Sequence, residues 1–334
     1  MPIEPASASP APSASSSVSG GSSVSGGSSD GATCSACGSG AVGEDGRCGD
    51  CGHLAAGVEH AEETLELPED PSGDLVVHGA GVTDRGHRRR RNEDAFALTR
   101  AVTAEGTPVV VAVVCDGVAS VPGGATASRT ACDVAVAAGH EALSGGQDLE
   151  EAAATAADAA RRAVAALAPA AGSSPACTYV AAVLDTERAV ISWAGDSRAY
   201  WLSPARPDES GVLTEDDSWA AEMVAAGIVE AEDALSDPRA HVITRWLAAD
   251  APDVVARHRG WPLDDTGVLL LCSDGVWNHL PDPAVLAALL TADEGAEESP
   301  VDVHAGALAL VDAALHEGGH DNATAIVLAV AARG

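Results

Sequence analysis

The chain has 334 residues, enough for one large domain or two small ones, and 46% of them are hydrophobic, which suits a globular core. Its formal charge of −32, from 50 acidic and 18 basic residues, would repel a nucleic-acid backbone or an anionic membrane, so neither is expected as a partner. The longest apolar runs have the length of strands, far short of the ~20 residues that span a bilayer. Divalent cations and basic or phosphorylated proteins stay open as partners.

The first segment, residues 1–32, is a low-complexity tract of Ser, Gly, Ala and Pro. Such a tract buries too little apolar area to offset its ordering entropy, so we expect it to be disordered. The chain has no basic residue before Arg47, and this segment has no apolar core stretch. A secretory signal is therefore not expected. We place the protein in the cytoplasm on this basis.

Residues 33–53 contain two CxxCG pairs with ten residues between the second and third cysteines. Each pair can chelate a metal through two thiolates on a tight turn, which indicates a structural Zn²⁺ ion, with two disulfides or four idle thiols as the alternative. The segment resembles the zinc-ribbon family. Four cysteine ligands leave no open coordination position, so the ion would stabilise a very small fold. The expected zinc ligands are Cys34, Cys37, Cys48 and Cys51.

Residues 54–74 are rich in Glu and Asp and contain two prolines, which favours a solvated acidic linker. Residues 75–334 alternate apolar strands with alanine-rich helical stretches and predict a catalytic domain of roughly 260 residues. Four single cysteines have apolar or small neighbours and are expected to be reduced core thiols, which fits a reducing compartment. They are Cys115, Cys132, Cys177 and Cys272.

Within this domain, apolar residues at helical spacing predict five helices. They fall at about 124–142, 149–167, 217–227, 283–291 and 301–316. Three closely spaced strands are predicted at 178–185, 189–195 and 198–202, with antiparallel pairing. Because strands group apart from helix pairs, we expect an α+β fold with stacked sheets and helices outside.

Four short motifs carry carboxylates, and three of them adjoin strongly apolar runs. A carboxylate beside a core strand is costly to bury alone, so several converging ones suggest cations between them. Asp116-Gly117 follows the run 109–114, Ser273-Asp274-Gly275 follows the run 268–271, Asp321-Asn322 precedes the run 325–330, and the fourth motif, RRRNED, spans Arg89 to Asp94.

In their order along the chain, six motifs resemble those of the metal-dependent protein phosphatase family (PPM, type 2C serine/threonine phosphatases) in its bacterial form. Any one of them is weak, since DG and DN also mark ordinary turns, but six in the family's order are specific. They are TDRGHRRRRNEDA at 83–95, Asp116-Gly117, WAGDSR at 193–198, HVITR at 241–245, CSDGVW at 272–277 and DNAT at 321–324. The resemblance covers about residues 78–331 and implies a four-layer α-β-β-α sandwich with two antiparallel sheets face to face.

The resemblance also implies a centre of two Mg²⁺ or Mn²⁺ ions. Asp116 would bridge both ions, and Asp274 and Asp321 would complete one metal site. Glu93 and the backbone carbonyl of Gly117 would serve the other. Oxygen ligands of this kind suit hard divalent cations.

Two further residues have roles by the same resemblance. Asp94 would hold a ligand or a water in place behind the metals. Arg89 aligns with the family's phosphate-binding arginine, whose planar fork can grip two phosphoryl oxygens. A hydroxide shared by the two ions would attack phosphorus directly, so no covalent phosphoenzyme is required. Cys115 and Cys272 lack the loop of backbone amides that a cysteine nucleophile needs and are expected in the core.

The function implied is hydrolysis of phosphoserine and phosphothreonine in proteins, opposing bacterial serine/threonine kinases in signal transduction. Phosphorylated proteins, kinases and kinase substrates among them, would be the partners. One alternative is a catalytically weak or inactive scaffold that binds partners through its zinc ribbon and phosphatase-like domain. Another is a phosphatase for small phosphoesters, which would share the site and differ only in the flap and groove. A scaffold would be expected to lose metal carboxylates, and Glu93, Asp116, Asp274 and Asp321 are all present.

Some segments depart from the family pattern or extend it. Val118 stands where animal members have a histidine, so the leaving oxygen would take its proton from a metal-bound water. Residues 174–178 have no aspartate close before them, which predicts a weak or absent third ion. Residues 213–242 resemble the mobile flap of bacterial members and are expected to govern substrate choice. Asp196 is expected to be structural within its turn.

An arginine run at 88–91 is unusual in so acidic a chain. Arg88, Arg90 and Arg91 either form a solvated charge cluster or help to hold an acidic phosphopeptide.

Overall fold

The computed structural model describes residues 60–66, 77–167, 173–251, 254–290 and 301–330. The predicted disordered tract (1–32) and the zinc-ribbon-like module (33–53) with its four cysteines lie outside these residues and stay predictions.

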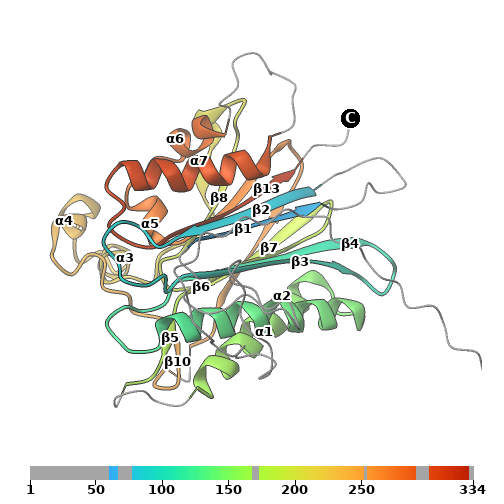
Figure 1. Ribbon diagram of the computed structural model, residues 1–334, viewed down its shortest axis with the longest axis horizontal. Coiled ribbons are helices and arrows are strands. Elements are labelled where there is room, and N and C mark those ends of the chain that lie inside the picture. Colours follow the sequence, from blue (N-terminus) through green and yellow to red (C-terminus); the bar gives the residue numbers. More distant parts are fainter. Residues whose placement is uncertain (1–59, 67–76, 168–172, 252–253, 291–300, 331–334) are drawn as a thin grey trace, which may run out of the picture.

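Two antiparallel sheets lie face to face, and helices cover both outer faces (Figure 1). One sheet has six strands, in the order β1 (His60–Glu66), β2 (Val77–Asp84), β13 (Ala323–Val330), β12 (Gly267–Cys272), β8 (Arg198–Leu202) and β9 (Gly211–Val212). The other has five, in the order β11 (Arg257–Pro262), β7 (Arg188–Ala194), β6 (Tyr179–Leu184), β4 (Pro108–Cys115) and β3 (Ala95–Val102). A short pair, β5 (Ala176–Cys177) with β10 (Leu247–Ala248), stands apart.

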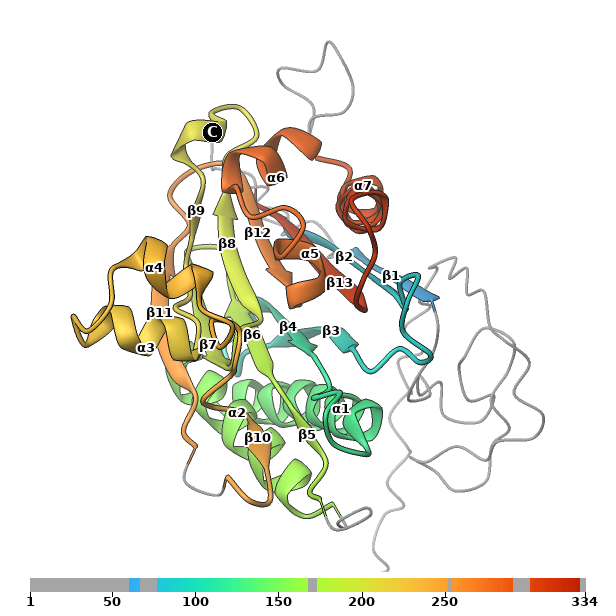
Figure 2. The ribbon, with the colours of Figure 1, turned by 90° about the vertical axis from the view of Figure 1, so that its left-hand side faces the viewer.

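Helices α1 (Gly124–Ser144) and α2 (Leu149–Ala165) cover the five-stranded sheet, and α7 (Val303–His316) covers the six-stranded one (Figures 1 and 2). The remaining helices are α3 (Trp219–Ala225), α4 (Ala231–Ser236), α5 (Asp274–Trp277), α6 (Pro283–Leu289) and the 3₁₀ turn η1 (Pro207–Glu209). The predicted four-layer sandwich is confirmed. None of the described helices is both long and apolar enough to cross a membrane.

The side chains that fill the layers differ in size. Between the sheets lie large residues such as Phe96, Trp201 and Ile326. Between the five-stranded sheet and its helices lie mostly Ala and Val, which let α1 and α2 approach the strands closely.

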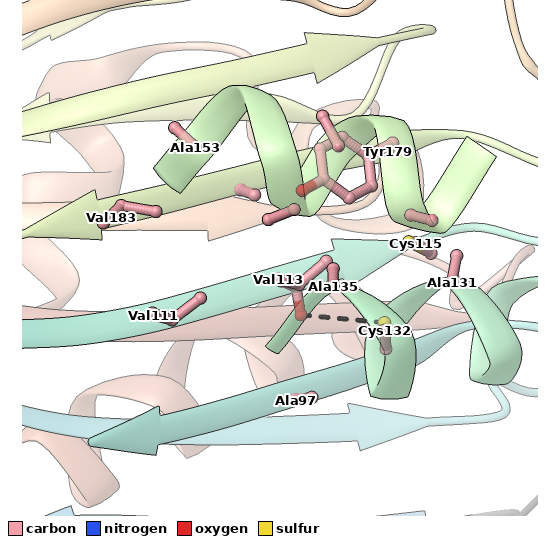
Figure 3. Close-up of a cluster of buried hydrophobic side chains, with 14 of the residues drawn as sticks. Ala97, Val111, Val113, Cys115, Ala131, Cys132, Ala135, Ala153, Tyr179 and Val183 are labelled. Atoms are coloured by element: carbon pink, nitrogen blue, oxygen red, sulfur yellow. Dashed lines mark hydrogen bonds between the residues drawn. The ribbon is translucent and has the colours of Figure 1, made fainter. Parts of the chain in front are cut away.

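Thiols share this second layer. Figure 3 shows Cys115 and Cys132 among alanines and valines, with Tyr179 beside them. Cys115, Cys132, Cys177 and Cys272 are free and fully buried, so their predicted place in the core is confirmed. Burial raises the pKa of the Cys115 thiol, which keeps it protonated and unreactive.

Strand β8 corrects one prediction. Residues 189–195 and 198–202 were expected to pair, but β7 pairs with β6 and β11, whereas β8 pairs with β12 and β9 in the other sheet. Gly195 has a φ of 112° at this crossing, and a Cβ there would lie 2.8 Å from the Thr178 side chain. The turn therefore carries the chain from one sheet to the other.

Strand β1 corrects another, because it lies inside the predicted acidic linker, 54–74. It pairs with β2 along its whole length. His60 donates to Asp84 (3.0 Å) and to Glu62 (2.7 Å), and Glu62 also accepts from His304 of α7 (2.7 Å). Hydrogen bonds to Asp84 and Glu62 raise the pKa of His60 to about 9. One of the acidic residues that suggested solvation, Glu62, is thus paired with two histidines, and the folded domain begins by residue 60.

Candidate active site

Carboxylates from both sheets gather at one end of the molecule because of strand register. Ala95 pairs with Cys115 at the end of β3 and β4, so Asp94 and Asp116 lie just beyond that edge. Ala325 pairs with Cys272 in β12 and β13, which places Asp274 and Asp321 beyond the matching edge of the other sheet. The apolar runs that predicted buried strands are β4, β12 and β13.

Asp94 joins the two sheets at this end. Its Oδ2 accepts hydrogen bonds from Ser273 Oγ (2.7 Å) and Thr324 Oγ1 (2.6 Å), both fully buried. Asp94 is itself buried, and its Oδ1 has no hydrogen-bond partner among the described residues. Burial, reinforced by Asp274 and Asp321, raises its pKa to about 7. A buried carboxyl with one oxygen unsatisfied is a group for which a nearby cation would be favourable.

Asp116 is fixed through its backbone. Its amide donates to Thr178 Oγ1 (3.0 Å), and its carbonyl accepts from the Thr178 amide (2.8 Å). Burial raises the pKa of Asp116 well above its ordinary value, and neighbouring carboxylates, Asp94 and Asp274 first among them, add to this. Burial and then Asp321 raise the pKa of Asp274 to about 6. The carboxyls thus destabilise one another's charge, as expected where a positive charge belongs between them.

Glu93 and Gly117 are neighbours, as the motif alignment requires. The Gly117 amide donates to the Glu93 carbonyl (3.1 Å). A Cβ on Gly117 would lie 2.6 Å from that carbonyl oxygen and 2.5 Å from the backbone of Gly124, so only glycine fits. The Glu93 amide donates to Asn322 Oδ1 (2.8 Å), which connects this segment to the Asp321 turn. Burial raises the pKa of Glu93, against the influence of Arg89 and Arg91.

Arg89 contacts the acidic cluster from the solvent side. Its guanidinium forms an ion pair with Asp321, and the side chain is 40% exposed. In this arrangement no group of three or more His, Cys, Asp or Glu side chains within the described residues converges as in a formed metal site. The donor set nevertheless fits hard divalent cations, because it consists of carboxylate and carbonyl oxygens and leaves Asp94 Oδ1 and Asp274 Oδ1 buried and unpartnered.

Comparison with known proteins agrees with this geometry. The family model described as protein phosphatase 2C matches residues 83–299. The chain belongs to the protein phosphatase 2C family. The serine/threonine phosphatase stp of Listeria innocua is 31% identical over 151 residues, which are 45% of this chain and 55% of that protein. The serine/threonine protein phosphatase PstP of Mycobacterium tuberculosis is 28% identical over 265 residues, 76% of this chain and 45% of that protein.

The chain thus spans about half the length of the curated relatives that it matches. Among solved structures, the M. tuberculosis phosphatase PstP/Ppp has a TM-score of 0.61 at 27% identity and covers 76% of this chain and 99% of its own. The catalytic domain of PstP in complex with two manganese ions has a TM-score of 0.59 at 26% identity, covering 77% and 99%.

One group of contacts beside the carboxylates of this protein phosphatase 2C domain was not predicted from the sequence. Trp277, at the end of α5, donates from Nε1 to the Asp196 carbonyl (2.9 Å). The Arg198 guanidinium lies over the Trp277 ring, 3.6 Å from its centroid, and forms two hydrogen bonds with Asp216 (2.8 and 2.9 Å). Only the nearness of these residues to the GDSR and SDG motifs could have indicated it.

Asp196 was expected to be structural within its own turn, but it also interacts electrostatically with the carboxylates of the candidate site. Burial, and after it the charge of Asp274, raises the pKa of Asp196 to about 8. Asp196 also contributes to the raised pKa of Asp116. A carboxyl that was expected to serve its own turn therefore lies within the electrostatic field of the candidate site.

The predicted flap of this phosphatase 2C domain consists of α3, α4 and their connections. Its base is closed by a bridge between Ser218 and Ile243 and by the Trp219 amide, which donates to the Val242 carbonyl (2.8 Å). Ile228, between α3 and α4, is 67% exposed. Asp216 lies where the segment leaves the domain, so the Arg198–Trp277 stack connects the base of this segment to α5, which begins at Asp274.

Proposed function

We propose that the protein is a metal-dependent serine/threonine phosphatase that hydrolyses phosphoserine and phosphothreonine in proteins with two Mn²⁺ or Mg²⁺ ions. The observation that carries the proposal is the gathering of carboxylates from both sheets at one end of the fold, with raised pKa values for Asp94, Asp116 and Asp274. Such a cluster is costly without cations and becomes favourable with them.

The ligand roles follow the motif positions. Asp116 would bridge the ions, Asp274 and Asp321 would bind one, and Glu93 with the Gly117 carbonyl would bind the other. The manganese-bound PstP domain, similar in fold and sequence, supports the choice of metal. When bound, such a pair of ions supplies Lewis-acid charge that activates water for attack on phosphorus.

The remaining roles belong to side chains around the metals. Arg89 has a half-exposed guanidinium that can grip two phosphoryl oxygens of the substrate. Val118 follows Gly117 with an aliphatic side chain, so the leaving seryl or threonyl oxygen must be protonated by water. Cys115 and Cys272 are fully buried, which leaves neither of them available as a nucleophile.

The wider assignments rest on the same proposal. The substrates would be phosphorylated proteins, serine/threonine kinases and their targets among them, in signal transduction. Free thiols at all four described cysteines support a reducing compartment such as the cytoplasm. The spacing of Cys34, Cys37, Cys48 and Cys51 supports a structural Zn²⁺ ion, which a zinc assay of the purified chain would detect.

The test is phosphate release from a phosphothreonine peptide, with Mn²⁺ or Mg²⁺ added and then with EDTA. We expect activity only with metal, and a loss of about 100-fold or more in Asp274→Asn, which removes one metal-binding charge. Asp208→Asn is the matched control. Asp208 is exposed and lies in η1, which follows the C-terminal end of β8, whereas Arg198 is at the N-terminal end of that strand.

The alternative is a catalytically inactive scaffold that binds partners through the same domain. Equal and negligible activity of wild type, Asp274→Asn and Asp208→Asn would establish it, with all three proteins folded and with wild type and Asp208→Asn metal-loaded. Circular dichroism and metal titration by calorimetry verify those two conditions.

A further inference from the structure

A strongly basic loop borders the acidic cluster. Residues 85–91 contain five of the chain's 18 basic residues, whereas the chain as a whole has a charge of −32. The side chains of Arg88, Arg90 and Arg91 are exposed. Within the described residues Arg89 is ion-paired with Asp321, but no ion pair is found for these three. With no ion pair to any described carboxylate, these three neighbouring arginines are available to an external anion.

The loop is held firmly against the candidate site. Asn322 Nδ2 donates to the carbonyls of Arg85 (2.7 Å) and Arg91 (2.9 Å), at the two ends of the loop. The His87 amide donates to the Gly319 carbonyl (2.8 Å). Gly86, with a φ of 76°, packs so closely that a Cβ would lie 2.1 Å from the Asp321 carbonyl oxygen. The arginines therefore project from a backbone whose position beside Asp321 is fixed.

The charge of the loop reaches the site. The Arg89 guanidinium forms an ion pair with Asp321 of the acidic cluster. Because Arg88, Arg90 and Arg91 adjoin Arg89 in the loop, a substrate phosphate held by Arg89 would place the neighbouring substrate residues beside these three side chains. Guanidinium groups bind carboxylates with two parallel hydrogen bonds, and a fixed backbone reduces the entropy lost on binding.

We propose that Arg88, Arg90 and Arg91 form a binding surface for Asp and Glu residues that flank the phosphorylated residue of the substrate. The inference rests on the proposed phosphatase function and narrows its substrate class to phosphoprotein segments of acidic sequence. Exposed pairs of this kind each contribute modestly and weaken with salt, so the selectivity is expected to be graded and ionic.

The test compares three peptides that share one phosphothreonine and differ in flanks of Asp/Glu, Gln/Ser or Lys. We expect kcat/KM to be about threefold to tenfold higher for the acidic than for the neutral flanks, through KM, and the ratio to approach one in 0.5 M NaCl. The double variant Arg88→Gln/Arg90→Gln should lose most of this ratio. Arg91 is left intact because it lies two residues before Glu93, a proposed metal ligand, and its charge acts on that carboxyl.

The matched control is Arg162→Gln/Arg206→Gln, which removes the same charge from exposed side chains on α2 and beyond β8. Equal ratios in the two double variants would mean a general charge effect and would overturn the inference. Equal kcat/KM of the wild type for peptides with acidic and neutral flanks would also overturn it. Hydrolysis of p-nitrophenyl phosphate would then show that the phosphatase function still stands. If no substrate is hydrolysed, fluorescence anisotropy of the labelled acidic peptide decides, with tighter binding to wild type than to Arg88→Gln/Arg90→Gln expected.

Discussion

The buried carboxylates and the exposed arginine loop occupy neighbouring stretches of one motif, yet their charges have opposite consequences. At Asp94, burial raises the pKa to about 7, and the charged form is unfavourable without a cation. At Arg88 and Arg90, only six and four residues earlier, charge is retained in water at little cost. The comparison indicates that burial, more than the sign of the charge, separates the groups that need a metal ion from those that can only attract a charged substrate.

Asn322 makes this contrast possible. Its buried side-chain amide hydrogen-bonds to both ends of the arginine loop and to the Glu93 amide. It therefore fixes the boundary between the exposed arginines and the buried carboxylates. Substitutions on the buried side are expected to have large effects, and those on the exposed side small ones.

Apart from the proposed metal ligands, the largest effect is expected from Asp94→Asn. An amide at this position cannot accept from Ser273 and Thr324 with the strength of a carboxylate, and it removes negative charge behind Asp116 and Asp274. We expect a decrease of about 10- to 100-fold in metal affinity or kcat. Calorimetric Mn²⁺ titration and phosphopeptide hydrolysis measure the two quantities. Folding stability should be kept or increased, since a poorly satisfied buried carboxyl is lost; wild-type metal affinity and rate would contradict the assignment.

Asn322→Ala tests the boundary itself. The substitution leaves the Arg85 and Arg91 carbonyls and the Glu93 amide without their partner. We expect unfolding free energy to fall by about 2 kcal/mol, measured by urea denaturation, because unsatisfied buried groups cost about 1–3 kcal/mol. Asn322→Asp keeps the acceptor for Glu93 and loses both donors, so it should fall in between. Equal stability of the three proteins would show that the loop is not held by this side chain.

The position of the buried carboxylates at strand ends could be predicted from the sequence. Strands β4, β12 and β13 are continuous apolar runs, and Asp116, Asp274 and Asp321 lie within two residues of their ends. Contacts between distant segments were not predictable in this way. The Ser273 and Thr324 hydroxyls reach Asp94 across 179 and 230 residues, and no local pattern marks them.

The two errors in the fold have the same origin. The composition of β1 suggests a solvated segment. The partners of its His60 and Glu62, which are Asp84 of β2 and His304 of α7, become visible only when those elements are in place. The short spacing between β7 and β8 suggests a hairpin, but the turn at Gly195 crosses between sheets because both strands have better partners elsewhere.

A smaller effect is expected from Trp277→Phe, which lies between the buried cluster and the flap. Phenylalanine keeps an aromatic face for Arg198 but loses the hydrogen bond to the Asp196 carbonyl. We expect kcat for a phosphopeptide to fall about threefold to tenfold while the overall fold is kept, because a neutral hydrogen bond contributes about 1 kcal/mol. Arg198→Met removes the ion pair with Asp216 instead, and should raise KM more than it lowers kcat. If kcat and KM change equally in Trp277→Phe and Arg198→Met, the Arg198–Trp277 stack has no specific effect through the flap.

The smallest effect concerns β1, where charges are neither buried like Asp94 nor exposed like Arg90. His60 has a folded pKa of about 9 against an ordinary value of 6.5, so its stabilisation is complete below about pH 6.5 and is lost as the pH rises through about 9. Its partners Glu62 and Asp84 have lowered pKa values and stay ionised across this range. We expect His60→Gln to lower Tm by about 2–4 °C at pH 6 and by much less at pH 10. His140→Gln, at an exposed position of α1, serves as the control; a deficit for His60→Gln that does not change with pH would mean that packing, and not charge, holds β1 to the sheet.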